Sequence, residues 1–394
     1  MKIGMILDDT FPPDPRVENE AIELIKEGHE VFLFCLTYGE QKLEEKINGI
    51  EVKRYPSTKL IYKLSALAYT IPVYSMIMKK KIVHFLTTYN IEAIHCHDIR
   101  VAEAVFWANK KLKLPVVLDM HDNLPDNMKY YPHLQKFPGK YIISPKKWKE
   151  KEAVFMEKAT KIVSVSQEFV DELIERTQKP EKFLLVPNTV NAAFYNEAVI
   201  NNEIIDRYRN NFSMLYLGDT NIRRGLLTAI DAIPALKESI PSIKLVIVGS
   251  NTTDYILKKR VAELGIEAYV DFQGWQDLKL FPSYILASDI CISPLHRSKQ
   301  HDVAYANKIF QYMSLAKPVL ASDAIAQKKL IEKVDSGLIF EDKNIPDFIE
   351  KTIELFESED LRKRLGANGE DFIKNDFNWS VTAKNLITLY NNIN

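Results

Sequence analysis

Residues 288–322 read SDICISPLHRSKQHDVAYANKIFQYMSLAKPVLAS, and this stretch decides the fold. It opens with an apolar run of strand length, residues 290–294, and a polar loop follows. A helix is predicted to begin near Asn307 and to end before Lys317, and residues 319–321 then form the next strand. In open α/β sheets, loops of this kind lie at the carboxyl ends of the strands, where ligands bind.

The beginning of that helix has the chemistry of a phosphate site. Asn307 is a candidate N-cap, and the first turn of a helix presents free N–H groups and a partial positive charge. Lys308 adds a full charge on the same turn. This combination favours a bound phosphate. The alternative is a solvated lysine, which is common in a first helical turn.

The rest of the chain repeats this alternation of strands and helices. Short apolar or β-branched runs are separated by helical patterns, for example residues 16–27 and 101–113. The predicted strands are residues 2–7, 30–35, 51–54, 93–97, 115–119, 161–165 and 183–187 in the first half, and 213–218, 244–249, 270–273, 290–294, 319–321 and 337–340 in the second. The pattern predicts an α/β protein with two Rossmann-like doubly wound domains, each built on a mostly parallel sheet.

Chain length and composition support two domains. A chain of 394 residues is too long for one ordinary core. We expect an N-terminal domain over residues 1–190, an Asn-rich linker over 191–210 and a C-terminal domain over 211–374. Residues 375–394 are predicted to form one more amphipathic helix.

The global composition narrows the class of function. The apolar share of 46% and the charged share of 27% are typical of a globular protein. A net charge of −1 argues against nucleic-acid binding through charge. The three cysteines, which lie in strand-like runs, are expected to be buried thiols in a reducing compartment. We expect neither a signal peptide nor a membrane span, and hence a cytoplasmic protein.

Two stretches of the first half leave alternatives open. Arg16 follows the proline-rich loop FPPDP and could contact a phosphate or an acceptor, or could be a surface arginine at a helix start. Residues 57–86 combine many apolar and aromatic side chains with lysines. We favour two core-facing helices interrupted at Pro72. The alternative is a surface that makes peripheral contact with the inner face of an anionic membrane.

Histidines and aspartates end two neighbouring strands of the first domain. His95 and His97 share one face of their strand by alternation, while Asp119 and His121 end another strand. An H-x-H pair can bind a metal ion, so a metal-dependent hydrolase is a rival interpretation. It requires further ligands at later strand ends, and the sequence supplies no convincing set.

Three segments resemble the retaining GT-B glycosyltransferases of family 4. ANKIFQYMSLAKPVLAS is similar to the donor-site segment P-N-K-x-F-E-Y-M-A-x-G-x-P-V of that family. FPPDPRV…GHEV resembles the opening of its polysaccharide-synthesising members, and HCHD…VVLDMHDNLPD resembles its pattern HaHD…plvyDaHElyPE. The resemblance implies two domains on either side of a cleft, with the last helix returning to the N-terminal domain.

The same resemblance implies roles for individual residues. His121 is expected to contact the transferred sugar, with Asp122 beside it where the family often has Glu. Gly218 and Arg224 match the family's G-x-x-x-x-x-K-G phosphate motif, with Arg223 adjacent. Further candidates are Trp275 as a stacking partner for the base, Arg16 and His97 on the acceptor or phosphate side, and Asn307 with Lys308 on the donor.

The E-x7-E motif of the family is the largest departure. Gln311 stands at its second position, and Val303 replaces the first glutamate. Asp302 or His301 is expected to substitute for the missing sugar contact. No D-x-D sequence occurs, so we expect metal-independent chemistry without a cofactor, in which basic side chains stabilise the leaving diphosphate.

The sequence therefore predicts a retaining glycosyltransferase that uses a nucleotide-diphosphate sugar. The expected acceptor is a saccharide or a lipid-linked saccharide, in surface polysaccharide or glycolipid synthesis. Two rivals are a sugar-nucleotide epimerase or hydrolase on the same fold, and a catalytically silent partner subunit suggested by Val303 and Gln311.

Overall fold

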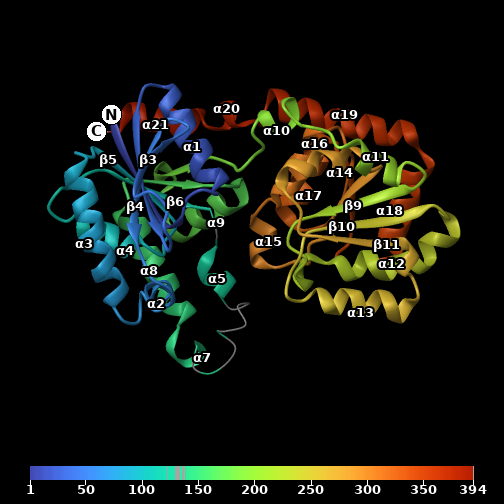
Figure 1. Ribbon diagram of the computed structural model, residues 1–394, viewed down its shortest axis with the longest axis horizontal. Helices are drawn as coiled ribbons and strands as arrows, with labels where there is room; N and C mark the ends of the chain where they lie inside the picture. The colour runs from blue at the N-terminus through green and yellow to red at the C-terminus, as the bar shows by residue number, and fades with distance from the viewer. Residues whose placement is uncertain (122, 129–133, 135–136, 138, 394) are drawn as a thin grey trace. The chain divides into compact units, whose positions relative to one another are not determined.

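The chain forms two compact units in the computed structural model (Figure 1). The structure describes residues 1–393 except 122, 129–133, 135, 136 and 138. Unit 1 comprises residues 1–187 together with 383–394, and unit 2 comprises residues 188–382.

Unit 1 is built on an eight-stranded sheet in the order β3-β4-β2-β1-β5-β6-β7-β8. All neighbouring strands are parallel except β3 and β4. The strands are β1 (Lys2–Thr10), β2 (Glu30–Thr37), β3 (Glu44–Ile47), β4 (Ile50–Pro56), β5 (Ala93–His97), β6 (Val116–Met120), β7 (Lys161–Ser164) and β8 (Phe183–Leu185). The helices of this unit are α1 (Pro15–Lys26), α2 (Lys59–Ser65), α3 (Val73–Thr88), α4 (Ala102–Ala108), α5 (Leu124–Met128), α7 (Gly139–Ile142), α8 (Pro145–Lys158), α9 (Gln167–Thr177) and α21 (Lys384–Asn392), with a 3₁₀ turn η1 (Pro180–Lys182).

Unit 2 is built on a six-stranded parallel sheet in the order β11-β10-β9-β12-β13-β14. The strands are β9 (Phe212–Leu217), β10 (Ile243–Val248), β11 (Val270–Gly274), β12 (Ile290–Ser293), β13 (Val319–Ser322) and β14 (Gly337–Phe340). Its helices are α10 (Ala193–Asn196), α11 (Asn202–Tyr208), α12 (Leu226–Ser239), α13 (Asp254–Leu264), α14 (Phe281–Leu286), α15 (Lys299–Val303), α16 (Asn307–Ser314), α17 (Ile325–Val334), α18 (Ile345–Glu357), α19 (Glu359–Asn375) and α20 (Trp379–Thr382), with 3₁₀ turns η2 (Ile222–Arg224), η3 (Glu267–Tyr269) and η4 (Leu278–Leu280).

The core of unit 2 follows from strands that are apolar on both faces. On one face, Met214 and Tyr216 of β9 pack with residues of α12 and α18. On the other, Leu215 and Leu217 pack with residues of α11, α14 and α16. Parallel strands that are covered on both sides are expected to read as continuous apolar runs. The predicted α/β class with two doubly wound domains is confirmed.

The structure differs from the sequence analysis at three places along the chain. Strand β3 was not predicted, because its sequence EEKI is polar; it lies at the sheet edge and pairs antiparallel with β4. The expected linker over 191–210 instead contains α10 and α11, and Ile204 and Tyr208 are buried in the core of unit 2. The expected single helix over 375–394 is two helices, α20 and α21, after α19 ends at Asn375.

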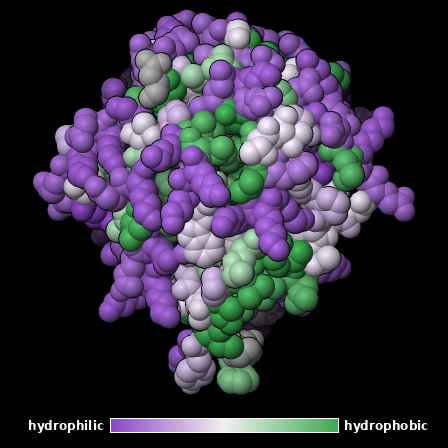
Figure 2. Space-filling model, turned by 90° about the vertical axis from the view of Figure 1, so that its left-hand side faces the viewer, coloured by the Kyte–Doolittle hydropathy of each residue, from purple (hydrophilic) through white to green (hydrophobic). Residues whose placement is uncertain are grey.

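Helices α2 and α3 also depart in part from the favoured interpretation. Helix α3 buries one side, including Tyr74, Met78 and Phe85, as expected for a core-facing helix. Helix α2 is not core-facing, because Ser65 alone of its 7 residues is buried. Figure 2 views the molecule from the left-hand side of Figure 1. Hydrophobic side chains gather on the lower part of the face shown there, over α2 and the beginning of α3. Within the described residues, no helix has both the length and the apolar character to cross a bilayer.

Candidate functional site

A group of polar side chains in unit 1, which we call the strand-end cluster, gathers where β5 and β6 end. Helix α1 begins at Pro15 with Asp14 as N-cap, and its first two turns place Arg16 and Glu20 over these strand ends. Alternation along β5 turns His95 and His97 to the same side, and their rings lie 4.5 Å apart. The cluster comprises Arg16, Glu20, His95, His97, Asp119 and His121.

Asp119 is the centre of the cluster. Its two carboxylate oxygens accept hydrogen bonds from Arg16 Nη2 at 2.7 Å and from Arg16 Nε at 2.8 Å. The Nδ1 atoms of His97 and His121 lie 3.1 and 3.2 Å from Asp119 Oδ2. Burial alone would raise the pKa of Asp119, but the charges of Arg16 and His121 hold it well below its ordinary value. Asp119 is therefore an ionised carboxylate in a fully buried position.

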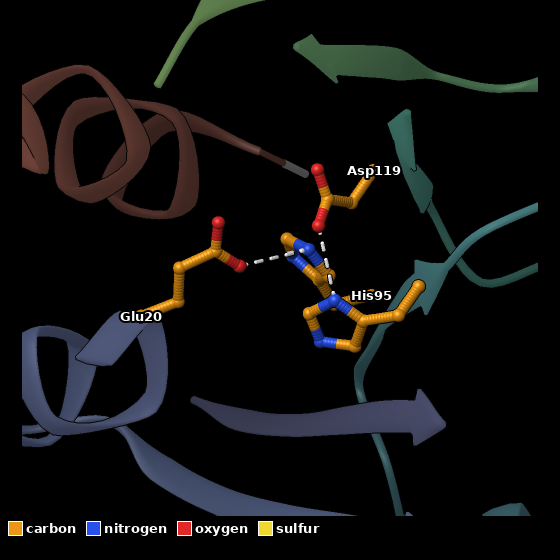
Figure 3. A group of neighbouring side chains, drawn as sticks. Glu20, His95 and Asp119 are labelled. Atoms are coloured by element: carbon orange, nitrogen blue, oxygen red, sulfur yellow. Dashed lines mark hydrogen bonds and ion pairs between the residues drawn. The ribbon is translucent and has the colours of Figure 1, made fainter. Parts of the chain in front are cut away.

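Glu20 and Tyr390 extend the cluster away from Asp119. Glu20 Oε1 lies 2.8 Å from Arg16 Nη2, and Glu20 Oε2 lies 3.3 Å from His95 Nε2. Figure 3 shows the Glu20 carboxylate turned towards His95. Burial raises the pKa of Glu20 to about 7 and lowers the pKa of His95 well below its ordinary value. On the other side of His95, the hydroxyl of Tyr390 from α21 lies 2.9 Å from Nδ1.

His121 is the member of the cluster that reaches the surface. Its side chain is 24% exposed, whereas those of Glu20, His95 and Asp119 are fully buried. Burial would lower its pKa, but Asp119 and Asp98 raise the pKa of His121 to about 10. At neutral pH His121 is therefore an imidazolium that offers Nε2, which lies 3.7 Å from Asp98 Oδ2.

The structure corrects the expectation for Arg16 in unit 1, and it leaves the expectation for Asp122 untested. Arg16 is neither a surface arginine nor open to a ligand, because it is buried between Glu20 and Asp119 and donates to the Val186 carbonyl at 3.0 Å. His97 is buried beside Asp119. Asp122, the predicted neighbour of His121, lies outside the described residues.

The further ligands that the sequence did not reveal are present in space. Glu20, His95, His97 and Asp119 each offer one ligand atom of the kinds that bind metal ions, and these atoms lie within 4.8 Å of one another. The guanidinium of Arg16 contacts both carboxylates, so a positive charge already lies between them. The cluster thus balances its buried charges with its own side chains.

The corresponding strand ends of unit 2 gather positive charge, in a group that we call the basic cluster: Arg223, Arg224 and Lys308. Lys308 stands on the first turn of α16, and its ammonium lies 3.4 Å from the centre of the Tyr216 ring. Burial and the charge of Arg224 lower the pKa of Lys308 well below its ordinary value. Across the described side chains, no hydrogen bond or ion pair of the Lys308 ammonium is found. A half-buried amino group that no described side chain pairs is well placed to receive an anion.

Gly218 and Arg224 lie at the same strand end as Lys308. Gly218 has a φ of +109°, and a Cβ there would lie 3.5 Å from Lys308 Nζ. Asp219, the next residue, accepts a hydrogen bond from Arg224 Nε at 3.3 Å. Arg223 donates to Gln300 at 2.6 Å. The structure therefore brings Gly218, Arg224 and Lys308 together, as the sequence predicts.

The loop after β12 packs directly against this group. Gly225 has a φ of +77°, and a Cβ there would lie 1.6 Å from the Pro294 carbonyl oxygen, so no other residue fits. His301 Nδ1 lies 2.6 Å from the carbonyl oxygen of His296, which fixes the proton on that nitrogen. Burial lowers the pKa of His301 to about 4, so its Nε2 is a hydrogen-bond acceptor. This Nε2 is buried, and no described group donates to it.

The remaining predicted donor residues are placed differently. Asp302 accepts two hydrogen bonds from Arg297, at 3.0 and 3.2 Å, and a third from the Ile325 N–H. Asn307 is not the N-cap: the N-cap is Ala306, and Asn307 is the exposed first residue of α16. Trp275 is not packed in the core, since it is 76% exposed beyond β11, and Gln311 is half-buried on α16.

Sequence reasoning missed Glu20 of the strand-end cluster and the aromatic neighbours of the two clusters, Tyr390 and Tyr216. Glu20 carried a weak local signal, because it stands four residues after Arg16 on the same face of a helix. Tyr390 carried none, since it meets His95 across 295 residues of chain. Tyr216 carried no signal beyond its place in an apolar strand.

Two mostly parallel sheets, each covered by helices, with polar or basic groups at their strand ends, match the architecture of the GT-B class of glycosyltransferases. Comparisons with known proteins agree with this class. Residues 16–194 match the family described as Glycosyltransferase Family 4, and residues 201–372 match Glycosyl transferases group 1. The chain therefore belongs to the GT-B glycosyltransferases of the family-4 type and is an enzyme of that kind.

Individual relatives are distant but span the chain. A phosphatidyl-myo-inositol mannosyltransferase of Mycobacterium leprae is 20% identical, over 100% of this chain and 97% of its own length. Sucrose-phosphate synthase of Thermosynechococcus elongatus is similar in structure with a TM-score of 0.77 and 17% identity, over 99% of this chain and 98% of its own. HepE of Anabaena, solved in complex with UDP, has a TM-score of 0.74 and 16% identity, over 99% of this chain and 100% of its own.

Proposed function

We propose that the enzyme transfers a sugar, with retention of anomeric configuration, from a nucleotide-diphosphate sugar to a saccharide or lipid-linked saccharide. The observation that carries this proposal is the half-buried Lys308 side chain, which lies beside Gly218 at the start of α16 and has Arg224 at the same strand end. A diphosphate would supply the negative charge that this position needs. HepE, the similar structure, was solved with UDP.

From the diphosphate, the donor sugar would extend to His301 and the base to Trp275. His301 Nε2 is the acceptor that we assign to a sugar hydroxyl, in place of the missing glutamate at Val303. Asp302 is less suited, because Arg297 and the Ile325 N–H already occupy it. The exposed ring of Trp275 offers a stacking surface for the base.

In the reaction that we propose, the bond from the anomeric carbon to the diphosphate breaks and a bond to the acceptor oxygen forms on the same face. The acceptor proton passes to the departing phosphate oxygen. Lys308 and Arg224 stabilise the charge that develops on the diphosphate. On the other unit, the imidazolium of His121 is assigned to the transferred sugar.

We propose that no metal ion takes part. Arg16 already neutralises Glu20 and Asp119 in the strand-end cluster, and a divalent ion there would add buried positive charge beside an arginine and the His121 imidazolium. Elemental analysis of the purified protein is expected to find no stoichiometric metal. A stoichiometric ion that disappears in His97→Ala would overturn this part.

Nucleotide binding tests the proposal directly. Thermal shift with UDP, GDP and ADP, and with their sugars, is expected to show stabilisation by one base. Lys308→Ala and Arg224→Ala should each weaken that binding about tenfold to a hundredfold, because each removes a charge-assisted contact. Lys328→Ala, on the exposed surface of α17, is the matched control. Stabilisation by none of the diphosphates, or unchanged binding in both variants, would contradict the proposal.

The product distinguishes transfer from its rival. With donor and acceptor together, NMR of the product is expected to show the anomeric configuration of the donor. Release of free sugar at the same rate with and without acceptor would instead identify a hydrolase.

A further inference from the structure

Several large apolar side chains of unit 1 are exposed and are not packed in its core. In helix α2 Leu60 is 67% exposed, and at the start of α3 Met76 is 55% exposed. Tyr141 of α7 is 76% exposed. The apolar patch, as we call it, consists of Leu60, Tyr62, Ile71, Val73, Met76, Phe137, Tyr141 and Ile142. Exposed apolar residues scattered singly need no explanation, but gathered ones mark an interaction surface.

Short-range contacts join these segments into one surface. The connection between α2 and α3 meets α7 through Thr70 Oγ1, which donates to the Ile142 carbonyl at 3.0 Å. Phe137 and Tyr141 have ring centroids 6.4 Å apart. Beneath them, the buried Tyr69 packs on Trp148 of α8 at 4.5 Å. The patch is therefore presented by packed elements, and its lower part is visible in Figure 2.

The charges within the two segments that carry the patch are of one sign. Residues 57–90 and 134–149 contain no aspartate or glutamate, although the chain as a whole has a net charge of −1. The exposed lysines in these two segments are Lys59, Lys63, Lys79, Lys80, Lys140, Lys146 and Lys147. Within the described part of the chain, none of these lysines has an ion-pair partner. The patch thus combines aliphatic and aromatic groups with uncompensated positive charge.

The combination of apolar side chains and lysines distinguishes between three kinds of binding partner: a second copy of the chain, a nucleic acid and a lipid surface. A second copy of the chain on the same face would bring these lysines against one another across a two-fold axis, which is unfavourable. A nucleic acid would use the lysines, but it has no need of aliphatic groups such as Leu60, Ile71 and Met76. An anionic lipid surface uses both, because the headgroups attract lysines and the acyl boundary accepts the apolar side chains.

We propose that the apolar patch and its surrounding lysines form a peripheral membrane-docking surface specific for anionic lipids. Docking would bring unit 1 to the layer in which lipid-linked acceptors reside. The surface lies on α2, α3 and α7, and it shares no residue with the strand-end cluster or the basic cluster. Its test therefore does not depend on the proposed donor chemistry.

Co-sedimentation with vesicles tests the proposal. The full-length protein is expected to bind vesicles of phosphatidylcholine mixed with phosphatidylglycerol, to bind pure phosphatidylcholine weakly, and to be released by high salt. Lys59→Gln with Lys63→Gln should lower the partition coefficient roughly tenfold or more, since each lysine near an anionic surface contributes to binding. Leu60→Ser with Met76→Ser should lower binding even at low salt, because the inserted apolar area is lost.

Matched controls keep the experiment decisive. Tyr255→Ser with Lys258→Gln and Lys259→Gln removes one exposed aromatic side chain and two exposed lysines on α13 of unit 2, and it should bind vesicles as the unaltered protein does. All substituted side chains are exposed, so thermal unfolding and nucleotide-induced stabilisation should be unchanged in each variant. The proposal fails if anionic vesicles do not bind at low salt, or if both patch variants bind normally. It also fails if light scattering shows a dimer that Leu60→Ser with Met76→Ser dissociates.

Discussion

The ammonium of Lys308 lies 3.4 Å from the centre of the Tyr216 ring. The phenol hydroxyl of Tyr216 donates to the Asp219 carbonyl at 2.5 Å, so the ring is fixed at both of its ends, by the strand and by the turn that follows it. An ammonium over an aromatic face is attracted by the ring electrons. The ring thus positions the Lys308 side-chain nitrogen at the strand end without supplying a counter-charge, so the protonated lysine can pair with a bound anion.

Replacing the ring should therefore weaken diphosphate binding without removing a charge. Tyr216→Leu is expected to lower the affinity for the preferred nucleoside diphosphate about tenfold, because the cation–π contact is worth about 1–2 kcal/mol in a desolvated site. Tyr216→Phe keeps the ring and should bind within about threefold of the unaltered protein. Titration calorimetry measures both. Equal affinity in Tyr216→Leu and Tyr216→Phe would contradict this role.

Diphosphate binding should also take up a proton. Burial and Arg224 lower the pKa of Lys308 in the free protein, whereas a bound anion would raise it again. At a pH above the lowered pKa, the lysine is neutral when free and charged when bound. Calorimetry in buffers of different ionisation enthalpy should report net uptake, and affinity should fall as the pH rises. Lys308→Met should show no uptake, and uptake that persists in this variant would assign the proton elsewhere.

His121 should remain an imidazolium well above neutral pH. Its pKa is raised from an ordinary 6.5 to about 10, against the effect of burial, by Asp119 and Asp98. Because the folded pKa is the higher one, the stabilisation is complete below about pH 6.5 and is lost as the pH rises towards about 10. NMR titration of the His121 ring, assigned with His121→Gln, measures this pKa. Asp119→Asn should lower it and should destabilise the fold, since Arg16 loses its buried partner.

Gly225 should tolerate no side chain. Gly225→Ala places a Cβ 1.6 Å from the Pro294 carbonyl oxygen at a φ of +77°, so the loop after β12 must move away. Gly28→Ala is the matched control, because its φ of +85° carries the strain while no heavy atom lies within 4 Å of the added Cβ. The control should cost about 1–2 kcal/mol of unfolding free energy, and Gly225→Ala more. Nucleotide affinity should fall in Gly225→Ala alone. Equal stability and affinity in the two variants would refute the close contact.

The fold could be predicted from the sequence because the hydrophobic pattern of each strand or helix lies within a few consecutive residues. Strands such as β5 and β14 begin and end at the predicted residues, since short runs rich in apolar residues, bounded by polar ones, define buried parallel strands. Strand β3 could not be found in this way, because a polar edge strand is specified by its partner and not by its own composition.

The candidate site could be predicted only in part. Lys308, Arg224 and Gly218 lie together because each follows a strand, and parallel strands end at the same edge of their sheet. Arg16 was misjudged, because its burial depends on Asp119, which is 103 residues away. The pairing of Asp302 with Arg297 removed a candidate that looked available when read alone. Charges at strand ends can be located from a sequence, whereas their partners cannot.

The path of the chain has a consequence for its synthesis. Residues 383–394 belong to unit 1, and Tyr390 among them meets His95, so the ribosome must finish all of unit 2 before unit 1 can be completed. A chain cut before Ala383 would keep unit 2 intact, and it would leave His95 of unit 1 without its partner Tyr390.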